Sequence, residues 1–397
     1  MTIRAVIRKI FMPESLDFSN SSVFIRTGQQ IIGTGRAVSF EATGPNRISE
    51  LSKKWQEFLS TAEIDDQSGL AGAGIIGLTS ISFSSLSKTP SVLYVPAITR
   101  VYREDQAFEV VIETPENLEK TEPIAASFEE GQVTGADFVS SVATAIERIN
   151  NTELEKVVLG RDLVMSKTGI PELAPAISRL HKKYPKCWTY LIGNVFGASP
   201  ELLLRADAGE VSARVLAGTA GRGTDPDVDR AIADGLAHSQ KNRHEHQYAV
   251  TSMVQALAPF CDVVDSDPEP FSLALPDLWH LATDVRGKLK AGVSLLDVIE
   301  KLHPTAAVAG TPTDLAEDLI SELEPFDRAG YAGPVGWLSS NGSGELAIAL
   351  RGGLIEEGQI RAIAGCGIVA ESDPEAELQE TELKFKAVRY AFSDSNA

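Results

Sequence analysis

The strongest constraint on the fold is a recurring pattern of apolar segments separated by short glycine turns. Near the carboxyl terminus, GELAIALRGGLI and GQIRAIAGCGIV form one such pair, and a helical pattern follows over about 374–392. Earlier, the strand-like segments KVVLGRDLVMS, CWTYLIGN, ELLLRAD and VSARVLAGTAGR are interspersed with helical ones. Strands joined by tight turns pair antiparallel, whereas parallel pairing needs a longer crossover. The pattern therefore predicts an α+β fold with large, mainly antiparallel sheets.

The amino-terminal part has a different pattern, with short strand-like segments and few helical ones. Residues 20–110 contain short segments rich in β-branched and aromatic residues, which predict strands. One helix is expected within them, because the segment 48–63 carries apolar residues at helical spacing. The polar segment 115–135 is the expected linker before a helix at about 136–151.

Two helix starts have capping signals. Asp225 followed by Pro226 predicts the start of one long helix, which can continue because no further proline occurs before Pro259. Ser372 and Glu375 have the spacing of a capping box, which predicts the start of the last helix.

Charge and length limit the classes of partner. The 397 residues include 36 basic and 55 acidic side chains, which gives a net charge of −19. The basic residues form no stripe, so we expect neither nucleic acid nor an anionic membrane surface as a partner. A small anionic ligand would need a locally positive pocket.

The cysteines and the apolar runs indicate a cytoplasmic protein. Cys187, Cys261 and Cys366 are far apart, odd in number and without CxxC spacing, which fits free thiols in a reducing compartment. The first 15 residues lack an uninterrupted apolar core of signal-peptide length. The uncharged run 67–87 is too polar to span a bilayer.

Two glycine-rich segments resemble phosphate loops only superficially. Gly72, Gly74 and Gly77 match GxGxxG, but neither a hydrophobic strand precedes them nor a helix follows, so a packed strand is expected instead of a nucleotide site. The segment 218–223, GTAGRG, lacks the ending of a Walker loop. Its backbone N–H groups can still bind a carboxylate.

The segment KNRHEHQYAV contains one candidate metal ligand. His244 and His246 are two residues apart on a predicted helix, so they cannot bind one ion together. Glu245 can ligate a hard cation. The alternative is a solvated carboxylate paired with Lys241 one turn earlier.

The last helix offers a similar cluster. Glu377, Glu380 and Lys384 lie along one helical face, and Mg²⁺ commonly takes one or two protein carboxylates together with oxygens of the substrate. The alternative is a solvated face. Lys156 and Glu201 are equally ambiguous in isolation, because both also fit ordinary strand ends.

The combination of motifs is more specific than its parts. Over residues 156–386 the blocks KVVLGR, SPELLLR, LAGTAGR, KNRHEH, HLATDVRG, LHPTAAVAGTP, YAGPVGW, ALRGG, AGCGIVAESDP and ETELK occur in one order. This order resembles the chorismate-utilising enzyme family, and within it the pattern is similar to that of isochorismate synthases. Over the first 120 residues only the β-rich character matches.

The resemblance implies an architecture and a substrate. It implies one large domain over 1–397, an α/β sandwich of two large, mainly antiparallel sheets flanked by helices, as in anthranilate synthase component I. A variable β-rich portion would occupy 1–125 and a catalytic portion 135–392, with the active site in a deep cleft. The expected partner is the small molecule chorismate, and the expected assembly is a monomer or weak homodimer.

The resemblance also implies binding residues. In such enzymes one Mg²⁺ ion binds the ring carboxylate of chorismate. The metal ligands fall on Glu245 and Glu380, with Glu377 as an outer carboxylate. The same ring carboxylate would be bound by the backbone at Gly218 and Thr219. Positions expected to hold the enolpyruvyl carboxylate are Tyr331, Arg351, Gly365 and Lys384.

The implied chemistry uses an acid and a base on opposite faces of the ring. Lys156 would activate water for attack at C2, and Glu201 would protonate the departing C4 hydroxyl. Burial lowers the pKa of a lysine from about 10.4 and raises that of a glutamate from about 4.3, as each role needs. His280 matches a family histidine near the leaving hydroxyl, and a satisfied core histidine is the alternative.

Three positions bear on the branch of the family. Lys156 is similar to the water-activating and amine-forming members, and Ala307 to isochorismate synthases, where other members usually carry Thr. Asn242 departs from the acidic residue of many relatives, which weakens the outer metal shell. We therefore expect an isomerase that makes isochorismate for menaquinone or siderophore biosynthesis, with LHPTAAVAG favouring menaquinone. The alternatives are an aminodeoxychorismate or salicylate synthase and a catalytically silent binding protein.

Overall fold

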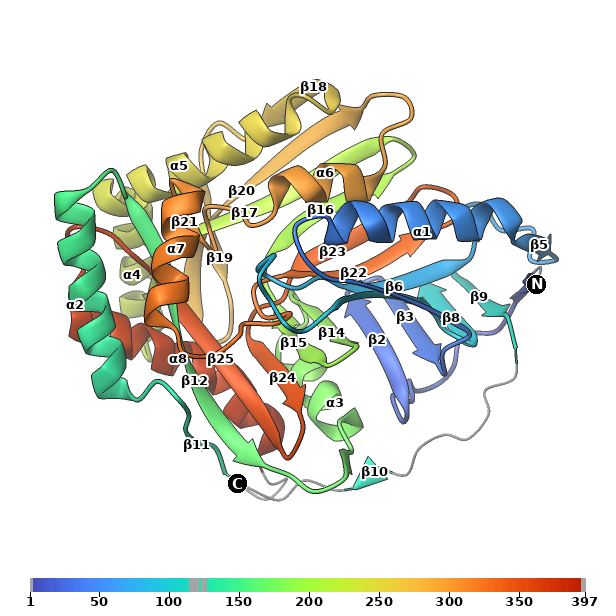
Figure 1. Cartoon of the computed structure of the whole chain (residues 1–397), viewed down its shortest axis with the longest axis horizontal. Coiled ribbons are helices and arrows are strands. Elements are labelled where there is room, and N and C mark those ends of the chain that lie inside the picture. Colours follow the sequence, from blue (N-terminus) through green and yellow to red (C-terminus); the bar gives the residue numbers. More distant parts are fainter. Residues whose placement is uncertain (1–2, 114–120, 123–126, 394–397) are drawn as a thin grey trace.

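The computed structural model describes residues 3–113, 121–122 and 127–393, without the side chains of Lys241 and Glu245. Two large sheets pack together, and helices cover their outer faces (Figure 1). The larger sheet has 13 strands. Twelve of them follow one another in a single order, which we call the main path, and β21 (Gly310–Thr311) pairs with β12 outside that order. The main path runs in the order β11 (Glu129–Glu130), β12 (Lys156–Ser166), β25 (Gln359–Ile368), β24 (Gly352–Glu356), β15 (Val195–Ser199), β14 (Trp188–Ile192), β2 (Ser21–Arg26), β3 (Gln29–Thr34), β8 (Ile98–Arg103), β9 (Gln106–Val111), β1 (Arg4–Lys9) and β5 (Glu63–Asp66).

The smaller sheet has 10 strands, of which β19 (Phe271–Ala274) pairs with β20 beside the main path. Its main path runs in the order β18 (Cys261–Ser266), β20 (Leu278–Leu289), β17 (Glu210–Gly221), β16 (Leu202–Asp207), β23 (Gly344–Ile348), β22 (Pro334–Ser339), β6 (Ile76–Ser80), β7 (Ser91–Val95) and β4 (Val38–Ala42). A separate parallel pair joins β10 (Thr121–Glu122) and β13 (Ile170–Pro171). Apart from that pair and β1 with β5, the strand pairs are antiparallel in the described residues. The predicted α+β class is confirmed.

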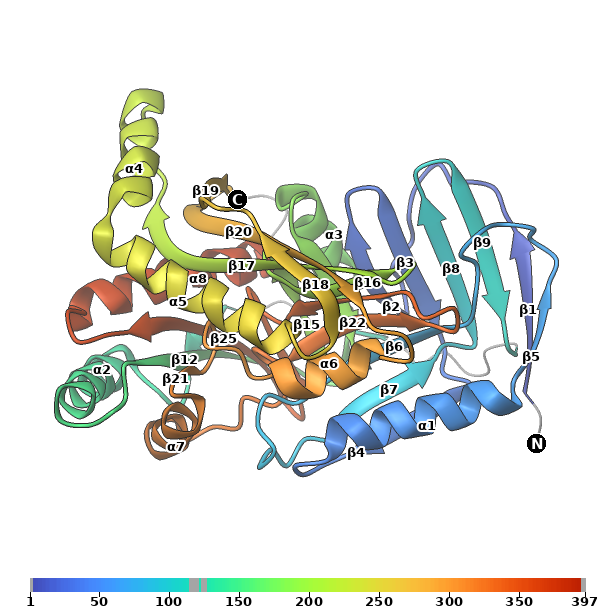
Figure 2. The same ribbon diagram turned by 90° about the horizontal axis from the view of Figure 1, so that it is seen from above.

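The helices form two outer layers (Figure 2). The smaller sheet is covered by α1 (Arg47–Thr61), α4 (Pro226–His238), α5 (Gln240–Leu257) and α6 (Leu295–Leu302). The larger sheet is covered or flanked by α2 (Gly135–Asn151), α3 (Ala174–Lys183), α7 (Thr313–Leu323) and α8 (Pro374–Phe392). The apolar faces of α3 and α8 bury Ile177 and Phe385 against Phe196 of the larger sheet, which forms a second core beside the main one.

The amino-terminal strands complete both sheets. In the larger sheet β2 pairs with β14, and in the smaller sheet β6 pairs with β22. Two strands of the described residues up to 113 therefore share backbone hydrogen bonds with strands that come later in the chain. Of the expected linker, residues 115–120 and 123–126 lie outside the described residues.

One predicted helix end and one predicted cap are wrong, whereas the bounds expected for the last helix, about 374–392, agree with α8. The expected long helix is divided at Ser239, which ends α4 and whose Oγ accepts a hydrogen bond from the Asn242 amide at the start of α5. At α8 the cap is Asp373, whose carboxylate accepts from the Ala376 amide. The Ser372 hydroxyl instead donates to Glu377 at 2.8 Å, so it serves a buried carboxylate rather than a capping box.

The glycine-rich segment around Gly77 is a packed strand. Gly77 lies in β6, whose residues are all buried, and a Cβ added there would come within 3.2 Å of the Trp55 ring. Close packing against α1 accounts for the glycine. The packed strand that the sequence predicts at this position is confirmed.

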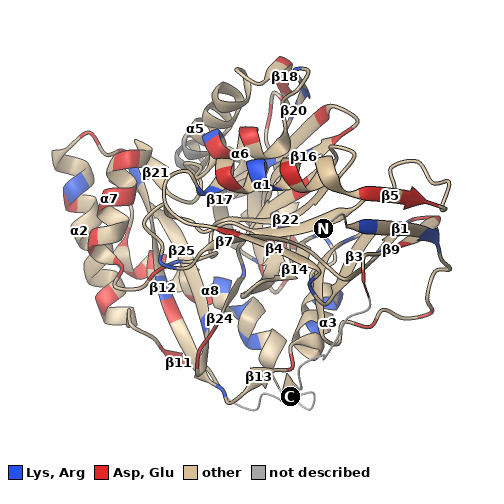
Figure 3. Ribbon diagram, turned by 45° about the vertical axis from the view of Figure 1, so that its right-hand side comes forward, with Lys and Arg blue, Asp and Glu red and all other residues tan. Residues whose placement is uncertain are grey.

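The remaining global expectations concern cysteines, charge and membranes. The three cysteines are free and buried. Lys and Arg are interspersed with Asp and Glu over both sheets and the helices (Figure 3). No helix in the described ranges is long and apolar enough to cross a bilayer.

Candidate active site

A cleft lies between the two sheets and is lined by β12, β25, β17, β20 and α8. It brings together most of the side chains and backbone positions that the sequence predicts. Those that line it are Lys156, Glu201, Gly218, Thr219, His280, Ala307, Tyr331, Arg351, Gly365, Glu380 and Lys384. Glu377 is not among the lining residues, and the Glu245 side chain lies outside the described part of the structure.

Two neighbouring chain crossings build the centre of the cleft. The chain leaves the larger sheet at the end of β15 and enters the smaller one at β16, and Glu201 lies in this step. It returns from β23 to β24 through Arg351. The crossings are joined by a hydrogen bond from the Ile348 amide to the Glu201 carbonyl at 3.1 Å. Because both residues lie between the sheets, their charged groups are placed inside the molecule rather than at its surface.

Glu201 has the environment of a carboxylic acid that stays protonated near neutrality. The whole residue is only 5% exposed, and its backbone amide donates a hydrogen bond to the Ser199 hydroxyl at 3.2 Å. Burial raises its pKa to about 8, although the positive charge of Lys156 acts in the opposite direction. Lys156 itself is buried at the first position of β12. The cleft therefore contains one acidic and one basic group that influence each other.

His280 is fixed between two partners. Its Nδ1 lies 3.1 Å from the Thr219 hydroxyl, and its Nε2 lies 2.9 Å from Nη2 of Arg351. The Thr219 pairing is created by an irregularity between β17 and β20, where the register shifts at Gly218. Gly218 has φ +83°, and an added Cβ would lie 3.2 Å from the side chain of Asn242, so this backbone position requires glycine.

Arg351 and Lys384 supply positive charge inside a chain of net charge −19. Lys384 Nζ donates to the Gly365 carbonyl at 2.7 Å and pairs with Glu380 at 2.6 Å. Removal from water in the cleft lowers the pKa of Arg351 from its usual value, although Tyr331 and the negative charge of Glu380 act in the opposite direction. Burial also raises the pKa of Tyr331 to about 12, so its hydroxyl stays protonated and available as a donor. These groups suit an organic carboxylate.

The acidic residues of α8 have separate surroundings. The Glu380 side chain is 26% exposed and faces the cleft, where its oxygens are hard donors of the type that Mg²⁺ prefers. The Glu377 carboxylate is buried and accepts from Ser372. The described residues contain no cluster of three His, Cys, Asp or Glu that can hold a metal, so further oxygen ligands would have to come from Glu245, water or substrate.

The two histidines of α5 face different surroundings, as their spacing predicts. His246 is buried, with Nε2 2.7 Å from the Thr283 hydroxyl and Nδ1 3.2 Å from the Ala217 carbonyl. His244 is exposed and packs on the ring of Tyr248. His246 thus fixes α5 against β17 and β20, next to the turn at Gly218.

Arg328 also lines the cleft, although none of the sequence motifs predicts it as a site residue. Its guanidinium pairs with Glu324 and donates to the carbonyls of Val158 and Val308 at 2.7 and 3.0 Å. It ties α7 to β12 and to the segment that carries Ala307. The available signal is a lone arginine within a stretch of small and apolar residues, FDRAGYAGPVG.

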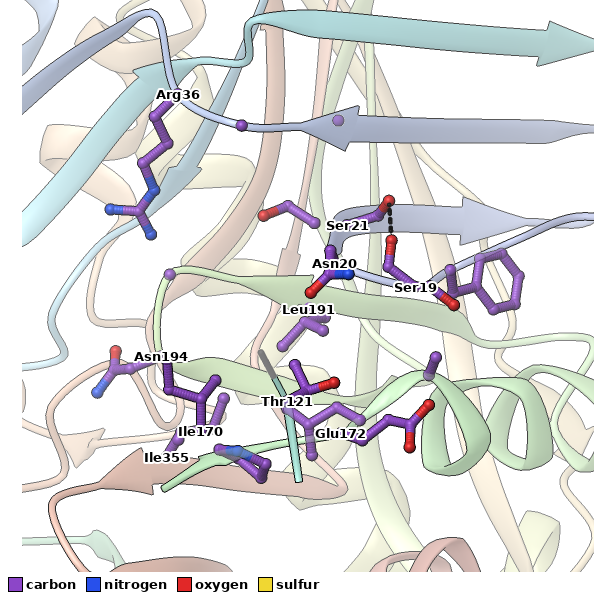
Figure 4. Close-up of a pocket in the computed structure, with 18 residues that line it drawn as sticks. Ser19, Asn20, Ser21, Arg36, Thr121, Ile170, Glu172, Leu191, Asn194 and Ile355 are labelled. Carbon is purple, nitrogen blue, oxygen red and sulfur yellow. Dashed lines mark hydrogen bonds between the residues drawn. The ribbon is translucent and has the colours of Figure 1, made fainter. Parts of the chain in front are cut away.

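A second depression lies elsewhere, on the larger sheet (Figure 4). Its wall includes Asn20, Arg36, Glu172 and Asn194, and none of the predicted site residues. The Arg36 guanidinium lies over the Tyr94 ring at 4.4 Å. Lys156 and Glu201 are therefore not part of this depression.

Comparison with known proteins agrees with the fold and the motifs. The family model for chorismate binding enzyme matches residues 95–393. Isochorismate synthase MenF of Bacillus subtilis is 31% identical over 396 residues, which covers 90% of this chain and 84% of the relative. Isochorismate synthase DhbC of the same organism is 35% identical over 264 residues, which covers 64% of this chain and 66% of the relative.

A solved structure shows the same architecture. The crystal structure of DhbC from Bacillus anthracis has 29% sequence identity and a TM-score of 0.80, and the match covers 95% of this chain and 97% of that one. The resemblance drawn from the motifs and the two-sheet fold that it implies are both confirmed. The chain belongs to the family of chorismate-binding enzymes.

Proposed function

We propose that this protein is an isochorismate synthase that interconverts chorismate and isochorismate. The observation that carries the proposal is the buried Glu201, with its pKa raised to about 8, in one cleft with Lys156 and Arg351. A protonated carboxylic acid and a lysine in a locally positive cleft suit the exchange of a hydroxyl group on an anionic ring. The curated relatives reported above carry the isochorismate synthase name.

In the proposed reaction every bond change has a residue assigned to it. Lys156 takes a proton from water as the oxygen bonds to C2 of the ring. The double bonds shift, and the C4–O bond breaks as Glu201 gives its proton to that oxygen, which leaves as water. His280 orients groups near the leaving hydroxyl through Thr219 and Arg351.

Binding would depend on both carboxylates of the substrate. Arg351, Lys384, Tyr331 and the backbone at Gly365 suit the enolpyruvyl carboxylate. The backbone at Gly218 and Thr219 suits the ring carboxylate.

We further propose Mg²⁺ as the cofactor. Glu380 and Glu245 would hold it, and Glu377 would act as an outer carboxylate. When bound, the ion would neutralise the charge of the ring carboxylate. The buried free thiols support the expected cytoplasmic, reducing environment.

The test is product analysis by NMR. Purified protein with chorismate and Mg²⁺ should form isochorismate until a stable mixture with chorismate is reached, and in ¹⁸O-labelled water the C2 hydroxyl should carry the label. EDTA and Lys156→Ala should abolish the conversion, whereas Lys167→Ala, just beyond the end of β12, should not. Salicylate with pyruvate, an aminated product with ammonia, or no turnover would each contradict the proposal.

A further inference from the structure

A second cavity adjoins the cleft at Glu201; we call it the rear cavity. It has a volume of about 110 Å³ and lies between α5, β17 and the segment from the end of α6 to the start of α7. Glu201 and Ala307 line both the cleft and the rear cavity. The acid proposed for catalysis is thus the point at which the two spaces meet.

The rear cavity suits water. Thr305 is one of its lining residues, and the hydroxyl of this residue is buried without a hydrogen-bond partner in the described structure. A buried hydroxyl without a protein partner is normally satisfied by ordered water. In liquid water each molecule takes up about 30 Å³, so the cavity volume of about 110 Å³ has room for a few water molecules. Ser252 and Lys301, which are exposed, lie in the lining and lead to the surface.

The proposed reaction creates a need for such a path. Each forward turnover leaves Lys156 with one extra proton and Glu201 with one fewer, so both groups must exchange protons with solvent before the next one. Lys156 also lines a wide groove of about 830 Å³ beside α2 and α5. Glu201, at 5% exposure, has the rear cavity as its second opening.

Resting on the function proposed above, we propose that the rear cavity holds a chain of water that returns a proton to Glu201 between turnovers. Thr305 is a positioning residue in this path, because its hydroxyl anchors the water next to the turn that carries Ala307. The bond changes are simple: a water molecule of the chain gives a proton to the carboxylate of Glu201, and the proton it loses is replaced from bulk solvent.

The test separates the first turnover from later ones. Ala256→Leu places a larger side chain in the rear cavity, and Thr305→Val removes the hydroxyl at nearly constant shape. With enzyme in excess over chorismate, both variants should convert at the wild-type rate, because Glu201 is already protonated. With chorismate in excess, kcat should fall about tenfold and its solvent deuterium isotope effect should rise.

The controls make the outcome unambiguous. Thr305→Ser should restore turnover, and Ala258→Leu, which adds the same bulk at the end of α5 outside the cavity lining, should leave it unchanged. Equal losses in the first and later turnovers, or unchanged kcat in both variants while the wild-type protein is active, would overturn the role of the rear cavity. Absence of isochorismate with the wild-type protein would instead overturn the function on which this inference rests.

Discussion

Nη2 of Arg351 lies 2.9 Å from Nε2 of His280, and this contact determines the tautomer of the imidazole. A guanidinium group has only donors, so Nε2 must accept and the proton must be on Nδ1. Nδ1–H then donates to the Thr219 hydroxyl at 3.1 Å. Burial, reinforced by the positive charges of Arg351 and Lys384, lowers the pKa of His280 well below its usual value. The imidazole is therefore neutral at physiological pH.

We expect this state to be visible by NMR. In protein labelled with ¹⁵N in histidine, His280 should show a neutral, Nδ1-protonated ring that does not titrate between about pH 6 and 8, where an ordinary histidine changes charge. An imidazolium signal from His280 at pH 7 would refute the assignment.

The pKa of Glu201 predicts the alkaline side of the pH profile. Because burial raises this pKa to about 8, the carboxyl group is protonated below that pH and can act as an acid, and kcat/KM should fall as the pH rises through about 8. Glu201→Gln should lower kcat by about 10²–10⁴-fold and remove this dependence. The measurement is a pH series of initial rates, with the exposed Glu357→Gln as the matched control. An unchanged alkaline limb in Glu201→Gln would assign the titration to another group.

The methyl side chain of Ala307 is expected to affect which products form. A hydroxyl at this position would lie in the cleft lining beside the ring, where it can assist elimination of pyruvate. Ala307→Thr should therefore release more pyruvate or salicylate than the wild-type protein. Ala307→Val, which has nearly the same shape without the hydroxyl, should not. Chromatography of the products decides the matter, and an identical distribution in all three proteins would show that the methyl group of Ala307 does not limit elimination.

If Glu380 is a metal ligand, its substitution should change how much Mg²⁺ the activity requires. Glu380→Gln removes one charged oxygen ligand and should raise the Mg²⁺ concentration needed for half-maximal activity by at least about 10–100-fold, the loss that removal of an outer partner of a metal ligand already causes. Glu375→Gln, an exposed change on the first turn of α8, should leave the requirement unchanged. The readout is activity against Mg²⁺ concentration after treatment with EDTA. Equal requirements in the two variants would remove Glu380 from the proposed metal site.

The local pattern of the sequence predicts single elements better than their junctions. The spacing that predicts a helix from Asp225 onwards is correct, but it overlooks that Ser239 can cap a second helix in the middle of a continuous pattern. Helix propensity near Ser239 is compatible with either outcome, and packing of α5 on β17 and β20 decides between them. The same limit explains the cap at Asp373, where Ser372 is recruited by a buried carboxylate.

The site shows why its residues can be selected by resemblance but not by spacing. Glu201 and Arg351 are 150 positions apart in the sequence and meet because two chain crossings run side by side. Neither residue has a local signal that distinguishes it from a strand end. Arg328 and Thr305 are missed for a related reason, because their importance comes from a buried donor and an unpartnered hydroxyl that only the packed structure reveals.

The pairing of β2 with β14 and of β6 with β22 limits how the chain can be divided. The family model begins only at residue 95. A fragment that started at α2 would lack β2 and β6, and it would expose the edges of β14 and β22, which lie inside the two sheets. Such open edges favour aggregation. Backbone hydrogen bonds can be made by many different side-chain sequences, so the amino-terminal part can diverge in sequence and still keep its pairing with the later strands. The family model thus covers a shorter stretch of the chain than the two sheets that pair around it.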